Sequence, residues 1–473
     1  MSTTTTPASA LAAAPPAHPE LRRTLGLWDL VLLNVVAVVN LNLVPVAAAG
    51  GFPSLTLWIA GLLFFFLPQG IAVAEFGARY PEEGGIYSWA KKCFGEFHGF
   101  LAGWCYWTNN VFYIPTLLFY LVGISLYVGG EEYLKLGDDP AFVHLFSVIL
   151  LWLFTALNIR GLAVGKWVNN LGGVCAVLAT ILLVAVAGAV LSSRGPGTMA
   201  APASLLPSFA DWRTFSALSV ICFGLVGLEL GSVMGGEIKH PRRDVPRAAL
   251  IGGIACGVFY LAATMSLLFA LPAAQISVVQ GVLQAFQKLG AEAGLAWLLT
   301  PLALVLTISI AGTTAAWLAG SARIPFVAGL DRYLPAALAK LHPKWESPYV
   351  ALVAHATAST VCIAMSFLGA QVKEAYLTML QLAVFIQLVP FLYLYAGLFR
   401  VAGMPGGHFS SPGMLRAAGA AGLVMTVAAM VTAFVPADAI DSIWRFELKM
   451  VVGVALFLGA AWALFYGRGS ARM

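Results

Sequence analysis

Hydrophobic stretches separated by short polar segments run through most of this sequence. About twelve of them reach the roughly 20 apolar residues that an α-helix needs to cross a bilayer. Ten of the stretches are continuous and predict unbroken membrane-spanning helices. These ten predicted spans cover residues 55–76, 97–128, 142–157, 168–191, 248–271, 294–322, 349–368, 375–399, 417–435 and 451–465.

The other two stretches, the first and the sixth, carry polar or helix-weakening residues near their middle. In residues 27–50 these are Asn40, Asn42 and Pro45, and in residues 215–236 they are Gly224, Gly227, Glu229 and Gly231. Lipid cannot satisfy exposed backbone groups, so a broken helix is stable only where protein or a water-filled cavity surrounds it. Interrupted spans at corresponding places in two halves of a chain indicate a transport site.

The composition points to a polytopic membrane protein. Hydrophobic residues make up 60% of the 473 residues, charged residues make up 10%, and the mean hydropathy is +0.87. Soluble globular proteins have about 25% charged residues, so a soluble fold is excluded. The net charge of +5 is spread over loops, and we expect no nucleic-acid partner.

The distribution of basic residues predicts the orientation. The side of the N-terminus carries 19 of the 26 Lys and Arg residues, and the opposite side carries 7. The positive-inside rule therefore places both termini in the cytoplasm, with the chain in the inner (plasma) membrane. The first 19 residues lack the features of a signal peptide, and we interpret residues 1–24 as a disordered cytoplasmic tail.

Three polar segments identify a family resemblance. They are AEFGARYPEEGGIYSWAKKCFG at residues 74–95, GGEIKHPRRDVPRA at residues 235–248 and SARIPFVAGLDRYLP at residues 321–335. In this order and spacing they resemble the cytoplasmic loop signatures of the amino acid–polyamine–organocation transporters. The similarity runs from about residue 25 to residue 400.

The resemblance implies the leucine-transporter fold, an all-α membrane protein of about twelve helices. Spans one to five and six to ten would form two inverted repeats, with discontinuous helices 1 and 6 around one central substrate. Residues 25–400 would form this core, and residues 401–473 would contribute two peripheral helices and a C-terminal tail.

The resemblance also places the substrate between the two interrupted helices. A substrate carboxylate would bind backbone N–H groups at the start of a half-helix. The family has a glycine-rich turn in span one, whereas this chain has Val38, Val39 and Asn40 there. Asn40 can adopt left-handed geometry, and Pro45 can begin the second half-helix. In span six, unwinding is expected near residues 223–227, with Phe223 at the position of the family's aromatic gate.

Helix packing is the alternative reading for each of these positions, because asparagine and glycine both occur at helix contacts in membranes. Trp107 and Asn110 lie three residues apart on one helical face and either line the cavity or stack between helices. His355 is interpreted as a helix contact. The candidate substrate-binding residues are Val38, Val39, Asn40, Leu41, Asn42, Trp107, Asn110, Phe223, Val226 and Gly227.

Glu229 is the one acidic residue well inside a predicted span, and it is the candidate for proton coupling. An ionisable group at that depth is a functional hypothesis, because burial disfavours its charged form. The family's lysine in span five is absent near Ala176. Thr313 and Thr314 could hold sodium instead, although such hydroxyls also bond helix backbone.

We therefore expect a secondary active transporter of amino acids or related small amines. The alternatives are a polyamine or organic cation transporter of the same fold and a transporter-like nutrient sensor. No enzyme motif is present, so we expect no enzyme and no cofactor beyond coupling to H⁺ or Na⁺. The expected partners are a small-molecule substrate and the bilayer. We expect a monomer or homodimer without a disulfide-linked subunit, because residues 129–140 contain no cysteine.

Overall fold

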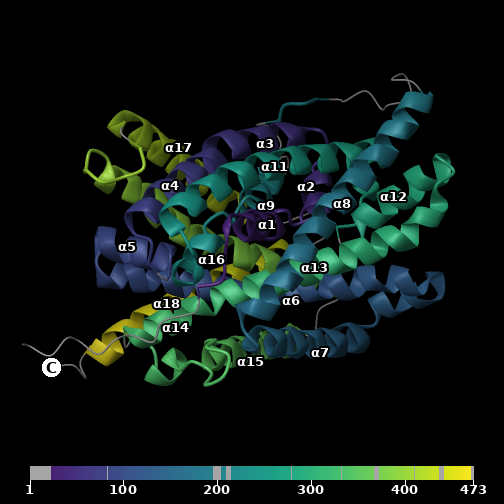
Figure 1. Ribbon diagram of the computed structural model, residues 1–473. Helices are drawn as coiled ribbons and strands as arrows, with labels where there is room; N and C mark the ends of the chain where they lie inside the picture. The colour runs from purple at the N-terminus through teal and green to yellow at the C-terminus, as the bar shows by residue number, and fades with distance from the viewer. Residues whose placement is uncertain are drawn as a thin grey trace, which may run out of the picture.

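A computed structural model describes residues 23–82, 84–194, 204–208, 215–278, 280–331, 333–366, 372–409, 411–435 and 442–469. The described chain is a bundle of helices, with the broken segments α1 and α9 in its middle (Figure 1). Most of the predicted tail, residues 1–24, lies outside the described residues.

The first five spans are formed by eight helices or helical segments, and the short helix α5 (Ile86–Phe94) connects the second span to the third. The first span is α1 (Leu27–Val38) and α2 (Val44–Ala48), and the second is α3 (Pro53–Gly61), the π-helical turn η1 (Leu62–Phe66) and α4 (Leu67–Arg79). After α5 follow α6 (Glu96–Gly129), α7 (Pro140–Ile159) and α8 (Leu162–Arg194).

The second half repeats this plan. Its spans are α9 (Ser216–Gly224) with α10 (Leu230–Val233), α11 (Pro241–Ala270), α13 (Leu299–Ser321) with α14 (Arg323–Leu330), α15 (Tyr349–Ser366) and α16 (Val372–Val401). The chain then forms α17 (Pro412–Thr432) and α18 (Ile443–Gly469).

The remaining helices lie in the connections. They are η2 (Glu131–Asp138), η5 (Gly235–Glu237), η6 (Ala273–Gln275), α12 (Gly281–Glu292), η7 (Ala296–Leu298) and η8 (Ala336–Ala339). Some predicted boundaries were wrong. The eighth span begins at Leu299 rather than residue 294, and its helical path continues through α14, so half of the SARIPFVAGLDRYLP segment is helical rather than loop.

Ten helical segments in the described part are long and apolar enough to cross a membrane. The two broken segments, α1–α2 and α9–α10, are additional to these ten, which gives the expected number of about twelve spans. The all-α architecture predicted from the sequence is therefore confirmed.

The helix contacts agree with the expected repeat of five spans. Helix α6 packs against α16, and their counterparts in the other half, α13 and α8, pack in the same way. Helix α1 packs on α8, as α9 packs on α16. The outer helix α18 contacts α6 and α16, and most of its surface faces outward (Figure 1). This arrangement leaves α1 and α9 at the centre, surrounded by protein as a broken helix requires.

Candidate substrate site

The first break covers residues 39–43 and forms without any glycine. Helix α1 ends at Val38, and α2 begins at Val44 with Pro45 in its first turn, as predicted. The Asn40 side chain turns back and donates its Nδ2 hydrogen to the Ala37 carbonyl over 2.7 Å. Asparagine competes with the backbone for hydrogen bonds in this way, which favours the end of a helix at this point.

Side chains from other helices satisfy the carbonyl groups that the first break leaves free. Thr313 Oγ1 donates to the Val36 carbonyl over 2.9 Å, and Trp317 Nε1 donates to the Ala37 carbonyl over 3.2 Å. Both residues lie on α13. Buried backbone groups are almost always paired, so α13 supplies partners that the missing helical turn would have supplied.

The second break covers residues 225–229 and depends on a glycine and a carboxylate. Gly227 has φ +138°, a backbone conformation that residues with a Cβ rarely adopt. Its N–H donates to Glu229 Oε2 over 3.0 Å. The unwinding expected near residues 223–227 begins two residues later, because Phe223 and Gly224 are still in α9. Gly231 lies inside α10 and not in the break.

The second break lies in direct contact with the end of α1, where the first break begins. A Cβ at Gly227 would be 3.0 Å from Val38 Cγ2 and 3.1 Å from the Ala37 carbonyl carbon. Tyr260 on α11 joins the same two segments, because its hydroxyl accepts from the Asn40 N–H over 3.0 Å and lies 2.8 Å from the Gly224 carbonyl oxygen. It also lies within hydrogen-bonding distance of the Val38 carbonyl. One hydroxyl proton can serve only one of these two carbonyls at a time.

Glu229 is fully buried at the end of the second break. Its carboxyl group accepts hydrogen bonds from Gln69 Nε2 over 2.7 Å and from the Tyr106 hydroxyl over 3.1 Å, in addition to the Gly227 N–H. Gln69 lies on α4 and Tyr106 on α6. The carboxyl group thus connects three spans, and within the described residues no Lys, Arg or His side chain forms an ion pair with it.

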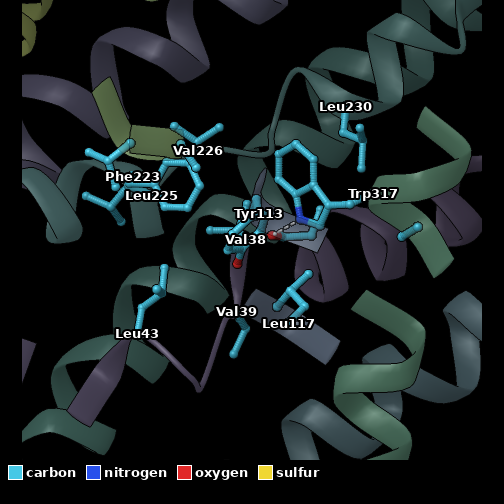
Figure 2. Close-up of a cluster of buried hydrophobic side chains, with 14 of the residues drawn as sticks. Val38, Val39, Leu43, Tyr113, Leu117, Phe223, Leu225, Val226, Leu230 and Trp317 are labelled. Atoms are coloured by element: carbon cyan, nitrogen blue, oxygen red, sulfur yellow. Dashed lines mark hydrogen bonds between the residues drawn. The ribbon is translucent and has the colours of Figure 1, made fainter. Parts of the chain in front are cut away.

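Apolar side chains surround the breaks (Figure 2). The Phe223 ring meets the Tyr113 ring edge-on with centroids 4.8 Å apart. Tyr113 also meets the Trp317 ring edge-on at 6.1 Å. Val38, Val39, Leu43, Leu117, Leu225, Val226 and Leu230 complete the labelled cluster. The surroundings of the site are therefore mainly aliphatic and aromatic, as binding sites for small molecules usually are.

A few polar atoms in this apolar region have no partner. Within the described residues, no acceptor is in hydrogen-bonding geometry for the backbone N–H groups of Leu41 and Asn42. The Asn40 Oδ1 and Asn110 Oδ1 atoms are buried without a donor. Buried polar groups without a partner are rare and require an explanation. A polar ligand that binds between the breaks would provide one.

The predicted residues do not all gather at the breaks. Asn110 shares one face of α6 with Tyr106 and Tyr113, which contact the second break. Trp107 instead donates its Nε1 hydrogen to His355 Nδ1 on α15 over 3.0 Å, which is the helix contact expected of His355. Thr314 donates to the Ile310 carbonyl of its own helix over 2.8 Å.

Sequence reasoning missed four residues that hold the breaks in place, namely Gln69, Tyr106, Tyr260 and Trp317. The spacing of Tyr106, Asn110 and Tyr113 on one helical face could have indicated Tyr106. Gln69 is an uncharged polar residue inside an apolar span, which is a weaker signal. Nothing in the sequence distinguishes Tyr260 or Trp317 from an ordinary core aromatic residue.

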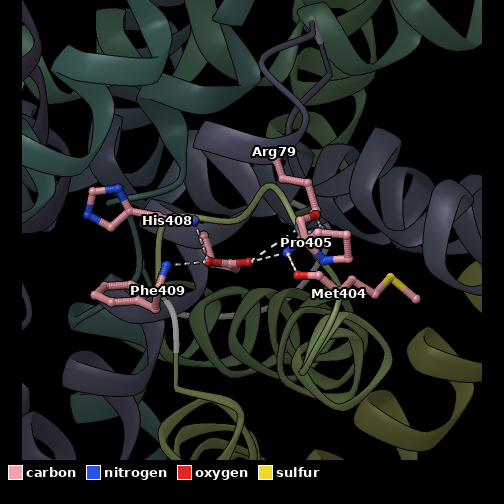
Figure 3. Close-up of polar contacts among 6 residues, drawn as sticks. Arg79, Met404, Pro405, His408 and Phe409 are labelled. Atoms are coloured by element: carbon pink, nitrogen blue, oxygen red, sulfur yellow. Dashed lines mark hydrogen bonds and ion pairs between the residues drawn. The ribbon is translucent and has the colours of Figure 1, made fainter.

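Two buried ion pairs connect segments on the predicted cytoplasmic side. Glu75 accepts from Arg79 Nη2 over 2.7 Å and from the backbone N–H groups of His408 and Phe409 (Figure 3). Arg79 also donates to the Met404 and Pro405 carbonyls, so the loop after α16 is held against the end of α4.

The second ion pair closes this side next to the broken helices. Arg323 at the start of α14 forms two hydrogen bonds with the Glu237 carboxylate, over 2.9 and 3.0 Å. The Glu237 carbonyl in turn accepts from the backbone N–H groups of Thr24 and Leu25. The end of the sixth span is therefore fixed to the start of the first span and to the eighth.

The inverted repeat and the paired broken helices define a multi-pass membrane transporter. A family model described as amino acid permease matches residues 25–457, which is nearly the whole chain. The chain therefore belongs to the amino acid permease family, within the amino acid–polyamine–organocation superfamily.

Named relatives agree with this assignment. An uncharacterised transporter of Legionella pneumophila is 26% identical over 454 residues, which are 93% of this chain and 96% of that protein. A probable agmatine/putrescine antiporter of Lactococcus lactis, AguD, is 28% identical over 61% of each chain. The branched-chain amino acid permease BcaP of Bacillus subtilis is 24% identical over 72% of this chain and 74% of its own length.

Proposed function

We propose that this protein is a secondary active transporter that moves an amino acid or a closely related small amine by alternating access. The substrate binds between residues 38–42, at the first break, and residues 223–227, at the second. The observation that carries this proposal is the direct contact of Gly227 with Val38 and Ala37, beside the unpartnered N–H groups of Leu41 and Asn42. These donors suit a substrate carboxylate.

An amino acid with an apolar side chain fits the surroundings better than a polyamine does. A polyamine carries several positive charges, and each needs a carboxylate when it is removed from water. Glu229 is the buried carboxylate at the breaks, and it already accepts three hydrogen bonds. Valine, leucine and aromatic side chains make up the rest of the labelled cluster.

The polyamine alternative has its own support. The relative AguD is named as a probable agmatine/putrescine antiporter, whereas BcaP is named as a branched-chain amino acid permease. A competition experiment distinguishes the amino acid substrate from the polyamine substrate. Excess leucine should block uptake of the labelled substrate under our proposal, and excess putrescine should block it under the alternative.

For coupling, we propose that Glu229 binds a proton during the transport cycle. Its position in the break and its bonds to three spans mean that a change of protonation alters contacts between the moving segments. Sodium coupling is the alternative, with Thr313 and Thr314 as ligands. Both hydroxyls already donate to backbone carbonyls, which favours a structural role for them.

We also propose that the chain lies in the plasma membrane with both termini in the cytoplasm. Cysteine introduced at Asp138, in η2, should react with an external reagent, and cysteine at His240 should not. The reverse pattern would overturn the orientation.

Flux tests the function itself. A thermal-shift screen of the purified protein over amino acids and amines identifies a ligand, because specific binding raises the melting temperature. The ligand, labelled, is then followed into proteoliposomes at several pH values, with and without sodium. We expect uptake that depends on the proton gradient and not on sodium. Binding without flux under every condition would instead identify a nutrient sensor.

A further inference from the structure

An open cavity of about 480 Å³ lies on the predicted cytoplasmic side, away from the substrate site. Three separate segments meet there, namely the chain before α1, the chain after α4, and the connection from η5 into the first turn of α11. The lining residues are Arg23, Pro81, Lys239, His240, Pro241, Arg242 and Arg243. The cavity is therefore assembled by the fold and not by one loop.

Positive charge dominates this cavity. Four lining residues are cations, namely Arg23, Lys239, Arg242 and Arg243, and none of the lining residues is acidic. Within the described residues these four side chains have no ion pair and no hydrogen bond. The nearby carboxylate of Glu237 is occupied by Arg323, and Asp244, in the first turn of α11, is buried. Within the described part of the chain, no ion pair therefore neutralises the cations that line the cavity.

The cavity lies beside surfaces that face lipid. Trp28, near the start of α1, is 68% exposed, and Leu250 on α11 is 66% exposed. Large apolar side chains are exposed to this degree where lipid covers them, and tryptophan is enriched at the headgroup level. Leu250 lies about 10 Å along α11 from Arg243 at a helical rise of 1.5 Å per residue. The cations are therefore at the level of phosphate groups.

We propose that this cavity binds the phosphate of an anionic phospholipid from the predicted cytoplasmic leaflet. Basic pockets between membrane helices on this side hold anionic headgroups, because several cations share one phosphate at the edge of the bilayer. A soluble phosphate has the same recognition chemistry. The adjacent lipid-facing surfaces of α1 and α11 favour the lipid, whose acyl chains can lie against them.

The bound phosphate would also stabilise the pairing between the segment before α1 and the segment after η5, which closes the predicted cytoplasmic side. The backbone pairs at this junction, since Leu25 N–H donates to the Glu237 carbonyl over 3.0 Å and Lys239 N–H donates to the Leu25 carbonyl over 3.0 Å. This pairing brings Arg23 to the same cavity as Lys239 and Arg242. Their mutual repulsion opposes the pairing, and a bound phosphate offsets it. Under the proposed function, the lipid therefore slows opening of the transporter on this side.

Lipid retention tests the site without reference to transport. The full-length protein is purified and incubated with phosphatidylglycerol or phosphatidylcholine, and bound lipid is counted by native mass spectrometry. The test variant is Arg242→Gln with Arg243→Gln. The matched control is Lys340→Gln with Arg416→Gln, which removes two exposed cations on the same predicted side but outside the cavity.

We expect the test variant to retain phosphatidylglycerol roughly tenfold less tightly than the parent, with the control unchanged. Equal retention by the test variant and the parent, or equal retention of the two lipids by the parent, would overturn the proposal. Inorganic phosphate and glycerol phosphate are added as competitors. Displacement of the lipid by either one at equal concentration would show a soluble-phosphate site instead. Should the test variant fail to fold, Arg23→Gln with Lys239→Gln replaces it.

A second measurement tests the proposed effect of the bound lipid on the transport rate. Uptake of the ligand from the thermal-shift screen is compared in liposomes of phosphatidylcholine with and without phosphatidylglycerol. Phosphatidylglycerol should change the rate of the parent severalfold and leave the rate of the Arg242→Gln, Arg243→Gln variant unchanged. Equal sensitivity of both proteins would contradict the link to opening. Selective lipid retention without any flux would leave the lipid site intact and overturn the proposed function instead.

Discussion

In the first break, between α1 and α2, no glycine is present, and side chains from distant helices satisfy the freed carbonyl groups. In the second break, between α9 and α10, Gly227 adopts a positive φ, and the nearby Glu229 carboxyl group accepts from its N–H. Both breaks have partners on distant helices, but only the second also has a glycine with positive φ and a local carboxyl acceptor two residues away.

This difference indicates that the two breaks have different roles in the transporter. Because α13 and α11 supply the partners of the first break, movement of these helices relative to α1 changes its hydrogen bonds. In the second break the bond from Gly227 to Glu229 joins residues two apart in the same segment, and this segment carries the ionisable group. We infer that the first break responds to the bundle, while the second holds the coupling residue in place.

The largest effect should come from Gly227→Ala. The new methyl group would be strained at φ +138° and would press on Ala37 and Val38 at the end of α1, next to the first break. We expect a loss of about 2 kcal/mol or more in stability, together with loss of transport. Gly188→Ala on α8 is the control, because no atom lies within 4 Å of its added Cβ. Equal melting temperatures for the two variants would contradict the contact between the breaks.

Asn40→Leu should remove transport while the protein remains folded. The Ala37 carbonyl loses its bond from Asn40 but keeps the bond from Trp317, so the break stays satisfied. The variant also removes the unpartnered Asn40 Oδ1 atom, which can then no longer accept a hydrogen bond from the substrate. Flux is measured in proteoliposomes, with Asn158→Leu as a buried control that contacts α13 away from the breaks. Normal flux and affinity in Asn40→Leu would mean that the asparagine serves only the helix end.

Tyr260→Phe tests the bridge between the two breaks. The variant leaves the Asn40 N–H and the Gly224 carbonyl without their hydroxyl partner, which should cost roughly 1–3 kcal/mol. The melting temperature and the transport rate should both fall. Tyr127→Phe is the control. It loses a hydrogen bond to Gln280 near the C-terminal end of α6 and should change the transport rate little. A normal rate in Tyr260→Phe would show that the breaks move independently of this hydroxyl.

Glu229→Gln should have the smallest effect on folding among these variants. Its specific effect should be on the pH dependence of transport. The amide oxygen can still accept from Gly227 and Gln69, so the local structure persists. The variant cannot exchange a proton, so we expect active exchange with a flat pH profile. The surface variant Glu82→Gln should keep the parent profile. A parent-like profile in Glu229→Gln would make Glu229 a structural residue.

The sequence predicted the two breaks for a physical reason. Asparagine, proline and glycine inside long apolar spans are costly unless they serve a purpose, and that signal is local. The partners of the first break were not predicted, because Thr313 was interpreted as a possible sodium ligand and Trp317 was not singled out. Long-range hydrogen bonds leave no periodic pattern. For the same reason Trp107 was grouped with Asn110, although the structure directs it to His355.

A cryo-electron microscopy map of the protein with the ligand from the thermal-shift screen tests the central claim most directly. Our account predicts ligand density between residues 38–42 and 223–227, with a polar group of the ligand within hydrogen-bonding distance of the Leu41 or Asn42 N–H. Density at any other place, with Gly227 still packed against Val38 and the two N–H groups still unpartnered, would contradict it.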